Sequence, residues 1–521
     1  MSQTFTSPYD DVEIPDVGIH QLILASADQR ADRMAIIDGP SGRSLTFAQL
    51  GDAIRRFAGG LSAKGFGKGD VLAVISPNLP EYAVIFHGTC LTGGSVTTVN
   101  PTYSADEIAY QLRDAGATVA ITIGMFLPTV RKAAENSGVT DIYTIDPHDD
   151  ATWIAELIGE PFTGEVELNP AEDLAVLPYS SGTTGLAKGV MLTHRNLVAN
   201  VMQIKPGAEF ADDEVVIAVL PFFHIYGMQV LMNAVLENGT TLVTIPRFDL
   251  EQFLSLIQEH KVTRAYVVPP IVLALAKHPL VEKYDLSSLR QVVSGAAPLG
   301  PDLAHAASDR IGTEVVQGYG LTETSPVTNL TPLGQSRPGT VGVLVPNLEM
   351  RIVDPTSGED QPAGQDGEIW YRGPNVMKGY LGRAQETGEM LDADGWLHTG
   401  DIGKIDEDGY LAITDRLKEL IKYKGFQVPP AELEAALINH PKIADVAVIG
   451  VADEEAGELP KAFVVPVAGE DLSEDEVMAF SAEHLASYKK VRRVEFIDEI
   501  PKSLSGKILR RELRDRERGR S

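Results

Sequence analysis

A stretch near the middle of the sequence is rich in hydroxyl groups and glycine. Residues 180–189, SSGTTGLAKG, hold four hydroxyl side chains, three glycines and one lysine. Such a stretch offers backbone N–H and O–H donors with little side-chain bulk in the way, as binding of a polyphosphate requires. An apolar run, 174–177, precedes the stretch and another follows it. We therefore expect a phosphate-binding loop between two strands.

The loop does not have the spacing of a Walker A motif, because Lys188 follows Ala187 and precedes Gly189. This argues against a P-loop kinase or GTPase, and a solvated turn is the plain alternative. The whole string 179–189 resembles the phosphate loop of the adenylate-forming superfamily, which comprises acyl-CoA ligases, luciferases and peptide-synthetase adenylation domains. The resemblance implies that the phosphates of ATP contact Ser180, Ser181, Gly182, Thr183, Thr184, Gly185 and Lys188.

A second candidate site is the string 317–323, QGYGLTE, at the end of a predicted strand. Ligands of open parallel sheets bind at the carboxyl ends of the strands. The glycines allow a planar ligand to approach the backbone closely, and a carboxylate oxygen suits Mg²⁺. The alternative is a glycine-bearing turn with a capping threonine. The string resembles the superfamily's adenine-binding motif. This implies that the nucleotide and its metal are held by Gln317, Gly318, Tyr319, Thr322 and, for Mg²⁺, Glu323.

A third string, 396–401, WLHTGD, ends in an aspartate. An isolated aspartate after a glycine is most often part of an Asx-turn. By resemblance to the superfamily, however, Asp401 accepts both ribose hydroxyls, and the paired oxygens of a carboxylate fit a vicinal diol.

A fourth string, 415–427, DRLKELIKYKGFQ, packs four cations into nine residues of an acidic protein. A solvated basic face is the plain interpretation, but the interleaved apolar residues indicate a partly buried strand over 417–423. The string resembles the superfamily's hinge and the loop after it. The resemblance places Arg416 on the ribose, Lys418 and Gln427 on the adenylate, and Lys424 and Gly425 on the side of CoA.

A fifth string, 501–508, PKSLSGKI, contains Lys507. A lone lysine near the end of a chain is usually a surface residue. In the superfamily, the lysine of the matching Gly-Lys-Ile bridges the substrate carboxylate and the α-phosphate. Two anions at about 4 Å repel by roughly 4 kcal/mol at a surface-like dielectric, and Lys507 would cancel that repulsion in the transition state.

The string 221–227, PFFHIYG, resembles the acyl-pocket motif of the ligases, although a packed core histidine is the default for His224. No acidic residue occurs from 221 to 236, which disfavours an amino-acid substrate, whose ammonium needs a carboxylate. Small residues at 294–298 and 318–320 leave room for a flat ring. The pocket most resembles that of 4-coumarate:CoA ligases, and medium- or long-chain fatty acids stay open as substrates. The acyl site is expected at His224, Tyr226, Gly295, Ala296, Gly318, Gly320 and Lys422, and the CoA site at Arg247, Lys424 and Gly425.

Composition narrows the class of protein. The chain has 521 residues, of which 44% are hydrophobic, enough for several domains. Its net charge of −29 argues against a nucleic-acid or anionic-membrane surface. The single cysteine, Cys90, follows an apolar run and is expected to be a buried thiol, and it excludes an internal disulfide or a cysteine-cluster metal site. The N-terminus lacks signal-peptide order, and the longest apolar run, 266–276, is too short to span a bilayer. A soluble, cytoplasmic monomer or homodimer is expected.

Apolar runs alternate with helical patterns from residue 71 to 146 and again from 215 to 317, which predicts two α/β subdomains with parallel sheets. In the second stretch, Asp249 is expected to cap a helix. The stretch 334–416 is punctuated by glycine and proline and predicts a β subdomain, a distorted barrel. Beyond it we expect a helix from Pro430, strands at 446–451 and 462–467, and a helix capped by Ser473 and Glu476. The predicted architecture is an N-terminal domain of residues 1–416 and a small, mobile α+β domain of residues 417–521.

The five strings occur in the superfamily's order along nearly the whole chain. We therefore expect an ATP-dependent carboxylate:CoA ligase that uses ATP, Mg²⁺ and coenzyme A, with Lys507, Thr322 and Glu323 as its catalytic residues. The C-terminal domain is expected to rotate about 416–418 between the two half-reactions. A luciferase-like monooxygenase, a serine amidase and a nucleotide-binding sensor without turnover are the alternatives from other classes.

Overall fold

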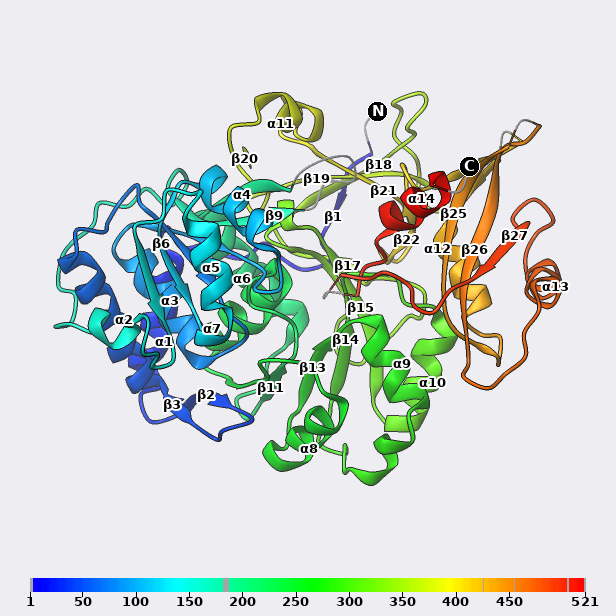
Figure 1. Ribbon diagram of the computed structural model, residues 1–521. Helices are drawn as coiled ribbons and strands as arrows, with labels where there is room; N and C mark the ends of the chain where they lie inside the picture. The colour runs from blue at the N-terminus through cyan, green and yellow to red at the C-terminus, as the bar shows by residue number, and fades with distance from the viewer. Residues whose placement is uncertain (1–2, 181–186, 425, 454, 504–505, 520–521) are drawn as a thin grey trace.

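Two α/β sheets make up most of the body of the protein in a computed structural model that describes residues 3–180, 187–424, 426–453, 455–503 and 506–519 (Figure 1). The first sheet has its parallel strands at one end and closes at the other with antiparallel β10 and β20. In spatial order its strands are β20 (Gly379–Tyr380), β10 (Lys188–Thr193), β9 (Leu174–Ser180), β5 (Ser95–Thr98), β4 (Val71–Ile75), β6 (Ala117–Thr122), β7 (Asp141–Thr144) and β8 (Thr152–Trp153).

The second sheet is parallel from β15 to β2 and antiparallel at both edges. Its strands in order are β17 (Val343–Leu344), β16 (Val327–Leu330), β15 (Glu314–Gly320), β14 (Gln291–Ser294), β13 (Arg264–Val267), β11 (Val215–Ala218), β12 (Thr241–Thr244), β2 (Met34–Asp38) and β3 (Ser44–Thr46). One continuous hydrophobic core serves both sheets. The two predicted α/β subdomains are therefore confirmed as sheets, but they share their interior.

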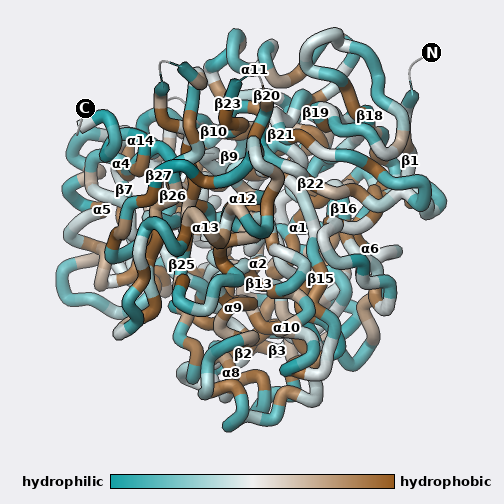
Figure 2. The backbone as a smooth tube through the Cα atoms, turned by 90° about the vertical axis from the view of Figure 1, so that its right-hand side faces the viewer, coloured by the Kyte–Doolittle hydropathy of each residue, from teal (hydrophilic) through white to brown (hydrophobic). Residues whose placement is uncertain are grey.

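Helices cover both sheets, and the hydrophobic segments gather in the interior strands and helices while the hydrophilic ones lie on outer loops (Figure 2). The helices of the body are α1 (Ile19–Gln29), α2 (Phe47–Ala63), α3 (Pro80–Leu91), α4 (Ala105–Ala115), α5 (Leu127–Ala134), α6 (His194–Ala208), the π-helix η3 (Tyr226–Ala234), α7 (Val235–Asn238), α8 (Leu250–His260), α9 (Pro269–Lys277), α10 (Pro301–Ile311) and α11 (Ala384–Met390). Short 3-10 helices lie at η1 (Gly124–Phe126), η2 (Ile154–Leu157), η4 (Pro279–Lys283) and η5 (Thr322–Thr324). The predicted cap of α8 is present, because the Asp249 carboxylate accepts a hydrogen bond from the Gln252 N–H at 2.9 Å. Cys90 is buried in α3, as predicted.

A third, antiparallel sheet corresponds to the predicted β subdomain. Its order is β1 (Phe5–Thr6), β18 (Glu349–Val353), β19 (Gly367–Arg372), β21 (Leu397–Ile405) and β22 (Leu411–Arg416). The segment is less self-contained than its sequence suggested: β17 and β20 leave it to join the two α/β sheets, and β1 enters from the N-terminus. Edge pairings of this kind satisfy backbone groups that would otherwise stay open.

The C-terminal part has its own sheet and cores. Its elements are β23 (Ile421–Tyr423), β24 (Phe426–Val428), α12 (Pro430–Leu437), β25 (Ile443–Asp453), β26 (Gly457–Pro466), α13 (Glu474–His484), β27 (Arg493–Phe496) and α14 (Arg510–Arg518). The Ser473 cap of α13 is confirmed by its bond from the Glu476 N–H. The predicted strand over 417–423 is only half right: the Glu419 and Leu420 N–H groups donate to the Arg416 carbonyl, so a turn precedes β23.

Candidate functional site

A cavity of about 820 Å³ lies where the strands of the second sheet end and the C-terminal part faces the body. The segment between β27 and α14 runs back toward β15 and α9 in Figure 1. The contact is close, because a Cβ added to Gly506 would lie 3.2 Å from the Pro270 side chain at the start of α9. Groups that are far apart in the sequence can therefore act on one ligand. The predicted residues that line the cavity are Ser180, His224, Tyr226, Gly295, Ala296, Gln317, Gly318, Tyr319, Gly320, Thr322, Glu323, Asp401, Arg416 and Lys507.

Asp401 is fixed by partners from two different elements. Asp401 in β21 pairs in register with Arg416 in β22, and its Oδ1 lies 3.1 Å from the Arg416 Nε. Its Oδ2 accepts a hydrogen bond of 2.5 Å from the hydroxyl of Tyr319, at the end of β15. Asp401 is 4% exposed. Both carboxylate oxygens thus point toward groups at the strand ends, where a vicinal diol could take the place of either partner.

Lys507 reaches this cluster from the C-terminal part. Burial, and after it the positive charge of Arg416, lower the pKa of its ammonium to about 8, whereas Asp401, Glu323 and Glu419 oppose the shift. Burial, and after it the charge of this ammonium, lower the pKa of His224 to about 4. Two cations therefore face one partly buried carboxylate cluster, an arrangement suited to an anionic ligand.

Glu323 is a buried acidic side chain that lines the cavity. Its Oε1 accepts a hydrogen bond of 2.8 Å from Tyr380 in β20, and the Lys188 ammonium lies over the Tyr380 ring at 4.9 Å from the centroid. Among the described residues, no three histidine, cysteine or acidic side chains converge on a point where a metal ion could sit. Mg²⁺ keeps several waters and binds through one or two carboxylates and substrate phosphates. A single buried carboxylate facing a phosphate site fits that requirement.

The wall next to this cluster is aromatic and closely packed. The hydroxyl of Tyr226 in η3 donates to the Val293 carbonyl at 3.4 Å, so its ring lies across β14. A Cβ at Gly295 would come within 2.8 Å of that ring, and one at Gly320 within 2.0 Å of the Pro326 carbonyl oxygen. Of the glycines predicted at the acyl site, Gly295 and Gly320 are therefore required by steric contacts, whereas a Cβ at Gly318 would come no closer than 3.4 Å to a neighbour. His224 is partly exposed to the cavity, and its Nδ1 accepts from the Tyr226 N–H at 3.3 Å.

Several predicted residues lie away from the cavity. Lys424 pairs with Glu455 at 2.6 Å on the surface of the C-terminal part, and its backbone φ is +47°. Other predicted residues that are exposed and do not line the cavity are Arg247, Lys418, Lys422 and Gln427. Lys188 does not line the cavity either; its ammonium lies over the ring of Tyr380, which donates to Glu323 at the cavity. Ser181, Gly182, Thr183, Thr184, Gly185 and Gly425 lie outside the described residues.

Three groups in or next to the cavity were not predicted. Tyr380 lies behind the lining and donates to Glu323, and Tyr266 and Arg264 of β13 line the deep end of the cavity. Arg264 is fully buried and lies 3.1 Å from Glu214. The sequence offered one signal for this pair, an arginine that opens an otherwise apolar strand, but its partner lies far away along the chain.

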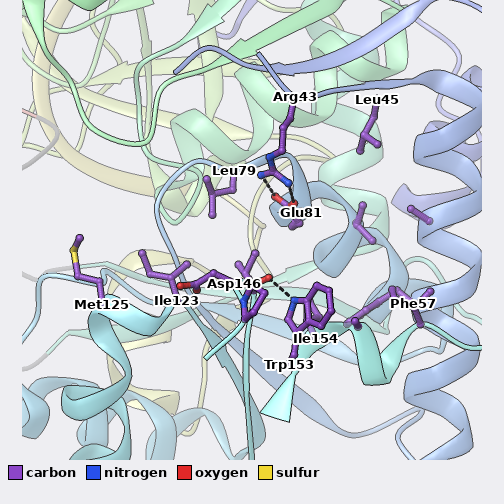
Figure 3. A pocket seen from close by; sticks show the side chains of 16 residues that line it. Arg43, Leu45, Phe57, Leu79, Glu81, Ile123, Met125, Asp146, Trp153 and Ile154 are labelled. Atoms are coloured by element: carbon purple, nitrogen blue, oxygen red, sulfur yellow. Dashed lines mark hydrogen bonds and ion pairs between the residues drawn. The ribbon is translucent and has the colours of Figure 1, made fainter. Parts of the chain in front are cut away.

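A second hollow, of about 690 Å³, lies on the body far from this cluster, between α2, the start of α3 and the η1 to η2 segment (Figure 3). Its walls are mostly apolar and include Trp153 and Met125, which are 45% and 78% exposed. Arg43 and Glu81 form an ion pair with each other, with 2.7 Å between the Arg43 Nη1 and the Glu81 Oε1. Asp146, which follows β7, also lines this hollow, and its Oδ1 accepts a hydrogen bond from the Gly124 N–H at 2.8 Å.

Comparison with known proteins gives the same picture over nearly the whole chain. Residues 23–381 match the AMP-binding enzyme family, and residues 432–507 match the AMP-binding enzyme C-terminal domain. The chain is 43% identical to 4-coumarate–CoA ligase 3 of Oryza sativa subsp. japonica over 98% of its length and 94% of that protein's. It is also 43% identical to 4-coumarate–CoA ligase 1 of Petroselinum crispum, over 98% of the chain and 96% of that protein.

Solved structures with the same fold include ligand complexes. ATP-bound MatB from Rhodopseudomonas palustris superposes with a TM-score of 0.87 at 31% identity, covering 96% of this chain and 99% of that one. The anthranilate CoA ligase AuaEII in complex with anthranoyl-AMP superposes with a TM-score of 0.89 at 28% identity, covering 97% and 98%. In the described part of the chain, no helix has the length and apolar character needed to cross a bilayer.

Proposed function

The chain belongs to the AMP-binding enzyme family, and from this premise we propose that it is an ATP-dependent carboxylate:CoA ligase for an aromatic, hydroxycinnamate-like acid. In the first step, an oxygen of the acid's carboxylate attacks the α-phosphorus of ATP, and the bond to pyrophosphate breaks. In the second, the sulfur of CoA attacks the acyl carbon; AMP leaves with the electron pair of its bond, and the thiol proton passes to solvent.

The observation that carries this proposal is the convergence of Lys507 and Arg416 on one cleft of a strongly acidic protein. The first step brings a carboxylate to a polyanion, and their repulsion must be cancelled where the new bond forms. Lys507 would bridge the carboxylate and the α-phosphate. Asp401 would accept the ribose hydroxyls, with Arg416 beside it.

The phosphates and Mg²⁺ would lie between Glu323 and the loop that ends at Lys188. Glu323 would hold the ion, which would supply charge neutralisation at the phosphates. Tyr380 would orient the Glu323 carboxylate through their 2.8 Å hydrogen bond. Thr322, which lines the cavity, would contact the α-phosphate, and Gln317, Gly318 and Tyr319 would form the adenine site.

The orientation of the C-terminal part supports a division of labour between two lysines. Lys507 lies within the cleft, whereas Lys424 is on the outer surface, paired with Glu455. We propose that this arrangement serves adenylate formation and that rotation about 416–418 withdraws Lys507 and brings in the loop of Lys424 and Gly425 for CoA. Lys418, Lys422, Gln427 and Arg247 would gain their contacts in the second arrangement.

The shape of the cavity favours a short, flat acyl group over a long alkyl chain. Tyr226 and Gly295 define a narrow aromatic wall, and the deep end is closed by the buried pair of Arg264 and Glu214. An alkyl chain that continued past this point would have to displace the ion pair of Arg264 and Glu214. The names of the curated relatives point the same way, since two of them act on 4-coumarate.

The direct test is a panel of acids scored for pyrophosphate release with and without CoA. Cinnamate, 4-coumarate, benzoate, hexanoate and palmitate span the candidate classes. We expect 4-coumarate and cinnamate to release pyrophosphate in an ATP-dependent reaction and palmitate to be a poor substrate. Palmitate as the best substrate would favour a fatty acyl ligase, turnover without ATP would favour an amidase, and light emission with a luciferin would favour a luciferase-like enzyme.

A further inference from the structure

Two neighbouring strands present alternate residues to the deep part of the cavity. In β13 these are Arg264 and Tyr266, and in β14 they are Gln291, Val293 and Gly295. Successive side chains of a strand point to opposite faces, so these residues share one face of the sheet. In register, Arg264 pairs with Gln291, and Tyr266 with Val293. The lining of the cavity therefore changes along the strands. Gly295 lies at the carboxyl end of β14, and the polar side chains of Arg264 and Gln291 lie at the opposite, deep end.

Tyr266 lies at a depth that an aryl acid can reach. Val268, at the end of β13, is near Gly506, because a Cβ on Gly506 would be 3.4 Å from the Val268 Cβ. That contact marks the level at which Lys507 and the carboxylate would meet. Tyr266 is two residues deeper and Arg264 four residues deeper, about 7 Å and about 13 Å along the strand. A ring joined to its carboxylate by two carbons extends to the level of Tyr266.

Arg264 is held rigidly behind Tyr266. Its Nη1 donates to the Ala208 carbonyl at 2.6 Å, its Nη2 lies 3.1 Å from the Glu214 Oε1, and its guanidinium packs on the Phe210 ring at 4.9 Å. The side chains of Arg264 and Glu214 are 0% and 1% exposed. Burial raises the pKa of the Tyr266 phenol, and Arg264 opposes that shift through its charge and as a hydrogen-bond donor. Arg264 and Glu214 thus form a neutral buried pair that faces the phenol.

The two tyrosines of the pocket use their hydroxyls differently. Their rings meet edge to face, with centroids 6.4 Å apart. The Tyr226 hydroxyl donates to the Val293 carbonyl, so its proton is already engaged. Arginine carries donors and no acceptor, so the Tyr266 oxygen can only accept from Arg264. The proton of the Tyr266 hydroxyl is then left to donate into the cavity, where the residue keeps 6% exposure.

We propose that Tyr266 donates a hydrogen bond to an oxygen atom at the end of the acyl group opposite the carboxylate, and that Arg264 and Glu214 position it for this role. The enzyme therefore selects para-oxygenated aryl acids. This inference rests on the proposed ligase function and names the specificity-determining residue of its acyl site. A site built to bond a substrate oxygen discriminates against the analogue that lacks it, since its own polar group is then left unpaired.

The experiment compares cinnamates whose para substituents have similar size and different hydrogen-bonding character. The hydroxyl group donates and accepts, the amino group is mainly a donor because its lone pair is conjugated with the ring, and the methyl group does neither. We expect the wild-type kcat/KM to be about fivefold to tenfold higher for the 4-hydroxy acid than for the 4-methyl acid, the value of one neutral hydrogen bond. The 4-amino acid should behave like the 4-methyl acid.

Three variants assign the effect. Tyr266→Phe should bring the ratio of 4-hydroxy to 4-methyl acid close to one by raising KM for the hydroxy acid, and its continued conversion of the methyl acid shows that the variant folds. Tyr226→Phe is the matched control and should change both acids by one common factor, because its hydroxyl bonds to the backbone. The double variant Arg264→Met with Glu214→Gln removes the pair without leaving a buried charge and should lower the ratio partway.

The outcomes separate this inference from the ligase function. A wild-type ratio near one, with all three acids converted to adenylates, overturns the role of Tyr266 and leaves the ligase function standing. A preference for the 4-amino acid that Tyr266→Phe abolishes shows the phenol to be an acceptor and overturns the donor assignment. If no acid yields an adenylate, the ligase function and this inference both fail.

Discussion

Two hollows of similar volume differ in the charge that they collect. The cleft beside Lys507 receives charged side chains from β21, β22, η5 and the C-terminal part. Burial and the charge of Arg416 together lower the pKa of Lys507 to about 8, against the opposing effect of the acidic groups. Among the described residues, the hollow around Trp153 has three charged side chains: Arg43 and Glu81 pair with each other at 2.7 Å, and Asp146 accepts a hydrogen bond from the Gly124 N–H. Volume alone therefore does not mark a reactive site. The convergence of acidic and basic groups from several elements, in a partly buried cleft that lowers the pKa of Lys507, is what distinguishes the first region.

Loss of Lys507 should produce the largest change. Lys507→Ala removes the cation between two anions, and we expect adenylate formation to fall by about two to three orders of magnitude, as when one transition-state donor is deleted. Conversion of supplied acyl-adenylate and CoA to thioester should persist. The half-reactions can be followed by pyrophosphate exchange and by thioester formation.

Lys442→Ala is the matched control for that experiment, since Lys442 is a surface lysine of the C-terminal part paired with Glu476 at 3.0 Å. It should leave both half-reactions intact. Equal loss of the two half-reactions in Lys507→Ala would contradict the division of labour between the lysines.

The two regions also differ in their ion pairs. Glu214→Ala leaves Arg264 buried without its partner and should lower the free energy of unfolding by about 3–5 kcal/mol. Glu81→Ala breaks a pair whose arginine is 58% exposed and should cost less than about 1 kcal/mol. Denaturant titration of the two variants measures both values. Similar losses in the free energy of unfolding would show that the burial of an ion pair does not distinguish the two regions.

Asp401→Asn should weaken nucleotide binding with a smaller effect on turnover. The amide keeps the shape of the side chain. It loses the negative charge that pairs with Arg416, and it loses one of the two oxygen acceptors for a diol. We expect KM for ATP to rise at least about tenfold, the loss of one charge-assisted hydrogen bond. Steady-state kinetics at saturating acid would show this, and an unchanged KM for ATP would place the ribose elsewhere.

The pH dependence of adenylation should carry the lowered pKa of Lys507. The ammonium is present below about pH 8 and is lost as the pH rises through that value. The kcat/KM of the first half-reaction reports the protonation state of the free enzyme. It should therefore fall about tenfold per pH unit above pH 8. Lys507→Arg keeps its charge in this range and should move the decline to higher pH. A decline that stays at the same pH in this variant would assign it to another group.

The smallest effect is expected in the hollow of Figure 3. Trp153→Ala removes an indole that is 45% exposed and whose Nε1 donates to the Ile145 carbonyl at 3.0 Å. Adenylation and thioester formation should stay within about twofold of wild type, as for surface changes away from a site. A tenfold loss in either half-reaction would show that this hollow is coupled to the cleft.

The features that could be predicted from the sequence are those that depend on local residue patterns. The apolar runs located β4 to β7 and β11 to β15 to within a few residues, and the Asp249 and Ser473 caps are present. The strings around Asp401 and Lys507 do meet in one cleft.

What the sequence could not supply depends on pairing between distant segments. β20 joins β10, which brings Tyr380 to Glu323, and Arg264 finds Glu214 only because β13 lies beside β11. The sequence of neither strand indicates which strand it pairs with, because register follows from the packing of the whole sheet. The turn before β23 was also missed, because apolar residues in a turn imitate a strand.

The most direct measurement is the detection of an acyl-AMP in the absence of CoA. Wild-type protein incubated with ATP, Mg²⁺ and 4-coumarate should accumulate one equivalent of coumaroyl-AMP per chain and release one equivalent of pyrophosphate, whereas Lys507→Ala should form neither on the same timescale. If none of the acids in the panel becomes joined to AMP in the wild-type protein, the convergence of charge in this cleft serves some other reaction and the account is wrong.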